Sequence, residues 1–357
     1  MDLLIKRDDL RECRFQESEP VELEPGQALL GVSSFGLSSN NVTYAVLGDA
    51  MSYWDFFPAE GGWGRLPVWG FGEVAESAND DLEEGTRVFG YFPASSQVVM
   101  APDRVDERGF VDSAPHRSAL PGAYNVYRRV EADPAYDARY EDQHMLLMPL
   151  FFTSFLIDDF LGDEGLFGAS AVVLSSASSK TALAAAFLLG RREGVEVIGL
   201  TSPGNVAFVE GVGVYDRVVT YDDVPSLPGD TAVYLDISND GNVRSAVHGR
   251  YGDGLAHSAL VGDTHWEEEW RGGDAELPGP KPTFFFAPDR IVKRAADWGP
   301  DGLEARLAEA WRPFVEWTDG WMKVVHGTGP ESVERVYLEL VNGRTDPSVG
   351  HVLSLRS

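Results

Sequence analysis

One segment, residues 171–221, restricts the fold of this chain more than any other. An apolar run, Ala171–Leu174, is followed by a turn of small residues, an Ala/Leu-rich helical pattern at Lys180–Leu189 and a second apolar run at residues 195–200. This alternation is typical of a βαβ unit. The helix of such a unit begins just past a strand end, where its N–H groups and its dipole attract a phosphate. The segment therefore predicts a nucleotide-binding turn.

The predicted turn lacks the glycines of the usual dinucleotide fingerprint. Small residues with hydroxyl groups stand there instead: Ser175, Ser176, Ala177, Ser178 and Ser179. Their hydroxyls can donate hydrogen bonds to a phosphate. Residues 178–181, SSKT, resemble the tail of a P-loop, but the glycines that a P-loop needs are missing, so the P-loop interpretation is disfavoured.

Composition excludes several classes of function. The 357 residues allow two domains, and the net charge of −28 repels nucleic acid and anionic membranes. The single cysteine, Cys13, excludes an internal disulfide and multi-cysteine zinc sites. No apolar run of about eighteen residues occurs, so we expect a protein that is soluble, cytoplasmic and independent of nucleic acid and membranes.

The rest of the chain separates into two kinds of pattern. Short apolar runs broken by Gly, Pro and Asp make the first ~140 residues β-rich, with strands expected within residues 25–48 (before a polar loop at residues 38–44), 68–77 and 84–93. An apolar helix is expected at residues 143–161, between two domains. Further α/β elements are expected up to residue 287: strands at 217–220, 231–237, 255–261 and 283–287, and helices at 206–210 and Gly241–Tyr251. Beyond them come helices at residues 302–317 and 331–342 and a strand at 351–355.

Several of these pieces, in their order and spacing, resemble the medium-chain dehydrogenase/reductase superfamily, in particular its zinc-independent, quinone-oxidoreductase-like branch. The pieces are PGQALLGVSSFGLSSNNVTY, GFGEVAES with EGTRVFGY, AVVLSSASSKTALAAAFLL, GVGVYDRVVTY and ESVERVYLELVNGRTDPSVGHVLSL. The combination NNVTYA, YWDFFPAEGGWGRLPVWGF and SASSKTA is unlike the common reductases and indicates an uncharacterised subgroup.

The resemblance implies an α/β protein with a GroES-like, β-rich substrate domain and an inserted Rossmann domain, a doubly wound parallel sheet. The substrate domain would comprise residues 1–140 and 288–357, and the Rossmann domain residues 141–287. It also implies an active-site cleft where the domains meet, hydride transfer from a nicotinamide to a polarised carbonyl or alkene, and a homodimer.

Charge predicts which nicotinamide cofactor is used. An acidic residue at the end of the second strand would bind the ribose of NAD(H) and repel a 2′-phosphate, but residues 201–205 are uncharged, which favours NADP(H). Lys180 is the nearest cation for that phosphate, or only a residue that begins a helix. The predicted cofactor contacts are Ser175, Ser176, Ser178, Ser179, Lys180, Thr181, Thr201, Ser202, Asn205 and Asp236. Asp236 ends the third strand, where it either contacts the cofactor or caps the next turn. Thr264 and His265 follow the fourth strand, and His265 is a minor candidate for a catalytic residue.

The substrate-side chemistry is predicted in the loop at residues 38–44. Reduction of a carbonyl places negative charge on oxygen, which requires a hydrogen-bond donor. No cysteine stands near Ser38, where zinc-dependent relatives place a metal ligand, so we predict a site without metal in which Asn40, Asn41 and Tyr44 are the donors and Tyr44 supplies the proton. The alternative is that the asparagines only satisfy the turn backbone.

An aromatic-rich segment follows at residues 53–69. We expect Tyr53, Trp54, Phe57 and Trp63 to line an apolar pocket, with Arg65 pairing with the ligand or with a neighbouring carboxylate. Ordinary core packing or an oligomer contact are the alternatives. The sequence thus predicts a zinc-free, NADP(H)-dependent reductase of an apolar or aromatic small molecule, and its alternatives are a lyase-like enzyme or a binding protein that has lost reduction.

Overall fold

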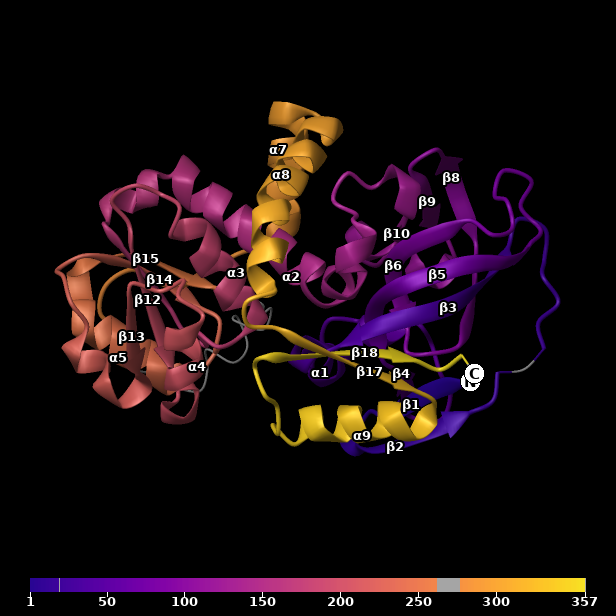
Figure 1. Cartoon of the computed structure of the whole chain (residues 1–357), viewed down its shortest axis with the longest axis horizontal. Coiled ribbons are helices and arrows are strands. Elements are labelled where there is room, and N and C mark those ends of the chain that lie inside the picture. Colours follow the sequence, from indigo (N-terminus) through magenta and orange to yellow (C-terminus); the bar gives the residue numbers. More distant parts are fainter. Residues whose placement is uncertain (19, 262–276, 357) are drawn as a thin grey trace. The chain divides into compact units, whose positions relative to one another are not determined.

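The computed structural model describes residues 1–18, 20–261 and 277–356, which leaves Thr264 and His265 outside the described residues (Figure 1). The chain forms two compact units. The first combines residues 1–147 with residues 322–357, and the second consists of residues 148–321. The boundary between them falls within the long helix α2 (Glu141–Asp163).

The second unit contains a six-stranded parallel sheet. Its strands are β11 (Ala171–Leu174), β12 (Glu196–Thr201), β13 (Arg217–Thr220), β14 (Ala232–Asp236), β15 (Leu255–Leu260) and β16 (Thr283–Phe284), in the order β13-β12-β11-β14-β15-β16. All neighbouring pairs run parallel, and the order reverses between β11 and β14. This is the doubly wound Rossmann arrangement, which confirms the predicted fold class.

Helices cover both faces of this sheet, because its strands are apolar on both sides. On one face the small residues Ala182, Ala185 and Ala186 of α3 (Lys180–Leu189) pack with α2 against β11, β12 and β14. On the other face Val243, Val247 and Tyr251 of α5 (Gly241–Tyr251) pack against β11, β12 and β14. Between β12 and β13 lie the short helices η7 (Pro203–Asn205) and α4 (Val206–Gly211), and η8 (Tyr221–Ser226) follows β13.

The second unit extends past the boundary that we expected at residue 288. Helices α7 (Ala287–Trp298) and α8 (Pro300–Thr318) belong to it rather than to the substrate domain. The reason is the aromatic face of α8: Phe314 lies 4.7 Å from Phe151 and 5.4 Å from Phe187 of α3, ring centre to ring centre. Arg290 and Arg294 of α7 both pair with Asp159 of α2, at 2.5 and 2.7 Å.

The first unit is built mainly from antiparallel strands. Its large sheet has the order β17-β18-β3-β5-β6-β10-β9-β8, with β7 also paired to β3, and a small sheet has the order β2-β1-β4. The strands are β1 (Asp2–Lys6), β2 (Asp9–Gln16), β3 (Ala28–Leu37), β4 (Trp63–Arg65), β5 (Pro67–Ser77), β6 (Arg87–Pro93), β7 (Gln97–Met100), β8 (Pro102–Asp106), β9 (Gly109–Asp112), β10 (Val126–Arg129), β17 (Lys323–Thr328) and β18 (Val349–Ser354). Together with the parallel sheet, this unit completes the predicted combination of a GroES-like and a Rossmann domain.

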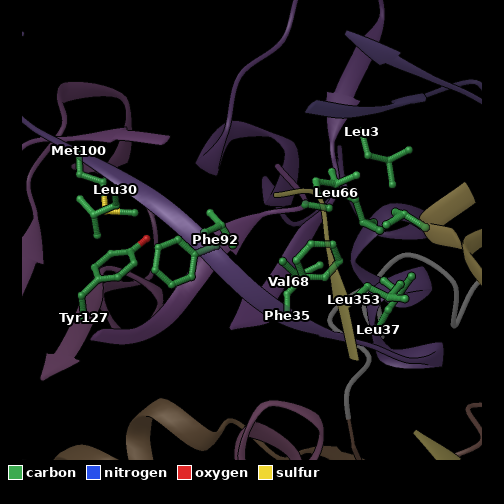
Figure 2. Close-up of a cluster of buried hydrophobic side chains, with 14 of the residues drawn as sticks. Leu3, Leu30, Phe35, Leu37, Leu66, Val68, Phe92, Met100, Tyr127 and Leu353 are labelled. Carbon is green, nitrogen blue, oxygen red and sulfur yellow. The ribbon is translucent and has the colours of Figure 1, made fainter. Parts of the chain in front are cut away.

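The core of the first unit joins both ends of the chain. Leu3, Phe35, Val68 and Phe92 are fully buried together with Leu353 of the last strand (Figure 2). Strand β18 pairs with β3, and α9 (Pro330–Val341) buries Val333, Val336 and Tyr337 in the same core. The C-terminal segment from residue 322 is therefore part of the first unit.

Residues 39–46 differ from the sequence prediction. The polar loop expected at residues 38–44 is the helix α1 (Ser39–Val46). Asn41 makes the difference, because its side-chain oxygen accepts from the Ser38 backbone N–H at 2.8 Å, which forms one half of a capping box.

Within the described residues, one helix, at residues 138–163, is long and apolar enough to cross a membrane by length and composition alone. Half of its apolar window is buried inside the structure, as in the core helix of a globular protein.

Candidate functional site

The serine turn of the second unit, residues 175–179, lies at the carboxyl end of β11, beside the point where the strand order reverses. Ser175 and Asp236 are fully buried there, and the Ser175 hydroxyl donates to Asp236 at 3.1 Å. Asp236 also accepts from Arg244 at 2.7 Å. The Ser175 oxygen in turn accepts from the backbone N–H groups of Ile237 and Ser238. These two predicted cofactor contacts therefore bind each other and fix the ends of β11 and β14. Asp236 also accepts from the Ser238 hydroxyl and the Asn239 backbone N–H, which is the turn-capping role given above as its alternative.

The bend after Ser175 uses a strained residue where the usual fingerprint has glycine. Ser176 has φ = +54°, in the left-handed region that costs an L-residue about 1–2 kcal/mol. Its backbone N–H donates to the hydroxyl of Tyr221 at 3.1 Å. The next residue, Ala177, is fully buried, and its carbonyl accepts from Tyr215 at 2.9 Å. A backbone that turns this sharply needs support from outside, and the two tyrosines provide it.

Helix α3 begins immediately after this bend. The Ser179 side chain caps it by accepting from the Ala182 N–H at 3.2 Å. Ser178 accepts from the Asn205 amide at 3.1 Å, so two predicted cofactor residues from different loops meet here. Lys180 and Thr181 are half-buried in the first turn of the helix. The helix dipole and these side chains form a site suited to a phosphate.

The end of β12 supplies the remaining predicted cofactor residues. Thr201 is buried, and Ser202 is half-buried beside the exposed residues Pro203 and Gly204 of η7. None of these residues carries a charge. The exposed Asp222 and Asp223 follow the neighbouring strand β13, where Asp223 accepts from Thr220 at 2.7 Å.

Tyr221 is the residue of this region that sequence reasoning missed. It directly follows β13 and places its hydroxyl on the serine turn. The available signal was its position, because side chains just past a strand of a parallel sheet lie at the edge where ligands bind.

In the first unit, α1 presents the three residues predicted for catalysis. Asn41 is buried, and both polar atoms of its side chain are hydrogen-bonded to the backbone. Its oxygen accepts from the Ser38 N–H, and its nitrogen donates to the Pro67 carbonyl at 3.0 Å. This geometry supports the backbone alternative for Asn41. Tyr44 is buried and accepts from the Trp69 indole N–H at 3.1 Å, and the neighbouring, half-buried Asn40 favours the charged form of its phenol.

Four tyrosines surround this point, and we call Tyr44, Tyr53, Tyr91 and Tyr124 the tyrosine cluster. Neighbouring rings lie 4.7 Å apart for Tyr44–Tyr53 and for Tyr91–Tyr124, and the Tyr53 and Tyr124 hydroxyls are 3.4 Å apart. Burial raises the pKa of all four phenols, that of Tyr53 to about 12. Every phenol of the cluster is therefore protonated at neutral pH and can act as a donor.

The charged groups buried near the tyrosine cluster neutralise each other. Arg117 is 1% exposed and pairs with the equally buried Asp112 at 3.1 Å. Its guanidinium also lies 4.6 Å from the ring centre of Phe57. The hydroxyl of Tyr91 and the Nη2 atom of Arg117 are buried polar atoms without a hydrogen-bond partner. Two buried donors that lack an acceptor favour an oxygen-bearing guest or a water at this place.

The aromatic segment at residues 53–69 divides between two places. Tyr53 and Phe57 join the tyrosine cluster, as does Trp69 at its edge. Trp54 is 1% exposed and belongs to the main core, where its ring fills the space beside Gly48 and Gly64.

Trp63 and Arg65 lie on the small sheet, away from the cluster. Trp63 stacks with the Arg14 guanidinium at 4.3 Å, and Arg65 pairs with Asp2 at 3.0 Å. The pocket interpretation thus fits Tyr53 and Phe57. Trp54 packs in the main core, and Trp63 and Arg65 have structural contacts because β4 pairs with β1 in the small sheet.

A hollow of about 270 Å³ lies elsewhere, at the edge of the second unit's sheet. It is lined by Phe160, His257, Phe284, Phe286 and Lys293, among others, and by none of the residues predicted from sequence. Across the described part of the chain, no group of three or more His, Cys, Asp or Glu side chains is arranged to hold a metal ion.

The fold matches solved structures over nearly its whole length. CurA from Vibrio vulnificus, in complex with NADPH, has a TM-score of 0.61 and 13% identity, covering 97% of this chain and 94% of that one. A mutant form of enoyl thioester reductase from Candida tropicalis has a TM-score of 0.58 and 11% identity, covering 99% of each chain. YhdH from Escherichia coli K-12, with bound NADPH, has a TM-score of 0.56 and 15% identity, covering 100% of each chain.

These likenesses show that the chain shares its fold with these proteins over nearly its whole length, which agrees with the fold class that the sequence predicted. No curated protein sequence matches the chain. A family model described as "Protein of unknown function (DUF2855)" matches residues 35–346, which span most of both units. The chain therefore belongs to the DUF2855 family.

Proposed function

We propose that this protein is an NADP(H)-dependent reductase that transfers hydride to a polarised carbonyl or enone of an apolar or aromatic small molecule, without zinc. The observation that carries the proposal is the serine turn, which opens a ten-residue helix at the reversal point of a Rossmann sheet. Ligands of such sheets bind at that point. The NADPH that accompanies CurA and YhdH, which share the fold, supports the same cofactor here.

The residues around the turn fit a dinucleotide. Ala177 approaches Gly199 so closely that a Cβ on this glycine would lie 2.9 Å from the alanine methyl, so the turn packs tightly against β12. Ser178, Ser179 and Thr181 would hold the pyrophosphate through hydroxyl and backbone donors, and the ammonium group of Lys180 would hold the 2′-phosphate. Bound NADPH would supply the hydride. Ser175 and Asp236 would act indirectly, by holding the turn in place.

The first unit would bind and polarise the substrate. Tyr44 would donate a hydrogen bond, and then a proton, to the oxygen that becomes negative on reduction. Tyr53, Phe57 and Tyr124 would contact the apolar body of the molecule. A raised phenol pKa keeps the proton on Tyr44 until the substrate oxygen takes it.

Titration with NADPH tests the cofactor. Saturable enhancement of nicotinamide fluorescence is expected, with NADPH bound more tightly than NADH. The Lys180→Ala substitution should weaken NADPH about tenfold and leave NADH nearly unchanged, since a charge-assisted contact to the 2′-phosphate is lost. Lys323→Ala, on β17, is the matched control. Equal losses for both nucleotides at Lys180 would contradict the 2′-phosphate contact.

Turnover tests the reaction class. NADPH oxidation with a panel of aromatic enones and ketones should fall at least a hundredfold in Tyr44→Phe, while NADPH affinity stays the same. If NADPH binds but no member of the panel is reduced, the lyase-like and binding-protein alternatives replace the reductase.

We also propose a cytoplasmic homodimer. Phe286, two residues after the edge strand β16, and Val292 of α7 are 46% and 70% exposed, which leaves apolar side chains available for a contact between subunits. A monomeric mass in sedimentation equilibrium would contradict the dimer.

A further inference from the structure

Strand β5 holds the catalytic side of α1 through two side-chain hydrogen bonds. Asn41 donates to the carbonyl of Pro67 at 3.0 Å, and Trp69, two residues further along the strand, donates its indole N–H to the Tyr44 oxygen at 3.1 Å. The start of strand β5 therefore fixes the helix through a backbone carbonyl and the hydroxyl that the helix presents through a side chain.

The direction of the second bond determines what Tyr44 can do. An indole N–H can only donate, so the Tyr44 oxygen must be the acceptor. The neighbouring Asn40 side chain favours the charged form of this phenol, as a nearby donor does. With its oxygen already accepting from Trp69, the Tyr44 hydroxyl is left to donate its hydrogen to a third group.

The surroundings restrict that third group to an uncharged molecule. The buried cation of this region, Arg117, is already neutralised by Asp112 at 3.1 Å. The other groups around Tyr44 are the phenols of Tyr53, Tyr91 and Tyr124, whose raised pKa values leave them uncharged at neutral pH. A carboxylate or phosphate would have to leave water without gaining a free positive partner.

We propose that Trp69 is a positioning residue that fixes Tyr44 as a hydrogen-bond donor, so that the tyrosine cluster selects an uncharged ligand with an acceptor-only oxygen, a ketone or enone, over the corresponding alcohol. The inference rests on the proposed function for the identity of the substrate site. The selection itself is a binding property, however, and is measured without hydride transfer.

Three matched probes test it by isothermal titration calorimetry: benzylideneacetone, the allylic alcohol made by reducing its carbonyl, and the hydrocarbon β-methylstyrene. The native protein should bind the ketone about three- to tenfold more tightly than the alcohol, the value of one net hydrogen bond. Trp69→Phe keeps an aromatic ring beside Phe89 but removes the N–H, which frees Tyr44 to accept. The ketone-to-alcohol ratio should then fall towards one, with the affinity for β-methylstyrene unchanged.

Two further variants keep the test decisive. Trp63→Phe makes the same chemical change on the small sheet and should preserve the ratio. Tyr44→Phe should abolish the ratio, and it provides the test if Trp69→Phe does not fold. A native protein that binds none of the probes, or that prefers the alcohol, overturns the proposal, as does a ratio that survives in Trp69→Phe. A protein that prefers the ketone but never oxidises NADPH would refute the reductase function while leaving the role of Trp69 intact.

Discussion

Both the serine turn and the tyrosine cluster hold polar groups in place in the apolar interior of the protein, but they do so by opposite means. The turn is made of five consecutive residues, and its bonds fix backbone: Ser175 bridges two strand ends, and Ser179 caps a helix. The four tyrosines of the cluster come from α1, β6 and two short 3₁₀ helices, and Trp69 of β5 hydrogen-bonds one of them. The bonds of the cluster fix hydroxyl hydrogens. A site formed by the backbone of one segment can be recognised from a short sequence motif. A site formed by side chains from several elements depends on the fold of the whole unit.

The largest expected effect tests whether the turn depends on its buried ion pair. Asp236→Ala leaves Arg244, only 14% exposed, without its partner, so the free energy of unfolding should fall by about 3–5 kcal/mol. Urea unfolding measures the change. The control is Asp240→Ala, which removes only the exposed cap of α5 and should cost about 1 kcal/mol. Equal losses in the two variants would mean that Asp236 does not hold the turn.

The next effect concerns His144 of α2. Its ring lies 4.6 Å from that of Phe89, which stacks on Trp69 beside the tyrosine cluster. Burial lowers the pKa of His144 to about 4, against about 6.5 in the unfolded chain. Its folded pKa is depressed, so the unfolded state takes up the proton first, and stability falls as pH drops from about 6.5 to about 4. The shift corresponds to about 3 kcal/mol.

His144→Gln cannot titrate, so the difference in unfolding free energy between neutral pH and pH of about 4 should shrink by about 3 kcal/mol. Urea unfolding over a pH series measures it. His326, which is exposed and lies 2.9 Å from Asp142, provides the control: His326→Gln should leave most of the slope in place. An unchanged slope in His144→Gln would indicate that this face is open to water.

A smaller effect is expected at the helix cap of the turn. Ser179→Ala removes the acceptor of the Ala182 N–H and should lower stability by about 1 kcal/mol. Ser245→Ala removes a hydroxyl from within α5 and should change stability by less than about 0.5 kcal/mol. Thermal unfolding compares the two, and a neutral Ser179→Ala would show that water caps α3 equally well.

The smallest effect distinguishes strain from flexibility within the turn. Ser176 has φ = +54°, so Ser176→Gly should raise the unfolding free energy by about 0.5 kcal/mol as left-handed strain is relieved. Ser178 is not among the positive-φ residues, and Ser178→Gly should lower stability by a similar amount. The sign of the difference between the two variants is the result to measure, by urea unfolding.

The sequence predicted the elements that local residues determine, and it missed those that depend on contacts from other parts of the chain. Strand β11, helix α3 and helix α5 begin and end where the sequence patterns predicted, because their residues are buried on local, periodic faces. The helix at residues 39–46 was missed, because its capping box uses Asn41 where the usual pattern has Glu or Gln, and because Asn41 is also held from outside the segment by the Pro67 carbonyl.

The aromatic segment shows the same limit. Nothing in its composition separates Tyr53, which joins the cluster, from Trp54, which fills the core beside Gly64. Tyr91 and Tyr124 carry no local signal at all, since β6 and a 3₁₀ helix place them. Burial in a particular layer is decided by the strand pairing, which a single segment does not encode.

The pairing of β18 with β3 sets an order of assembly. Residues 148–321 are complete in themselves, so the second unit can close while the ribosome is still adding the C-terminus. The first unit cannot, because Val333, Tyr337 and Leu353 of its core are synthesised last. Its early strands must wait with one edge and part of the interior uncovered, and the nascent chain is most exposed to aggregation and to chaperones during that interval.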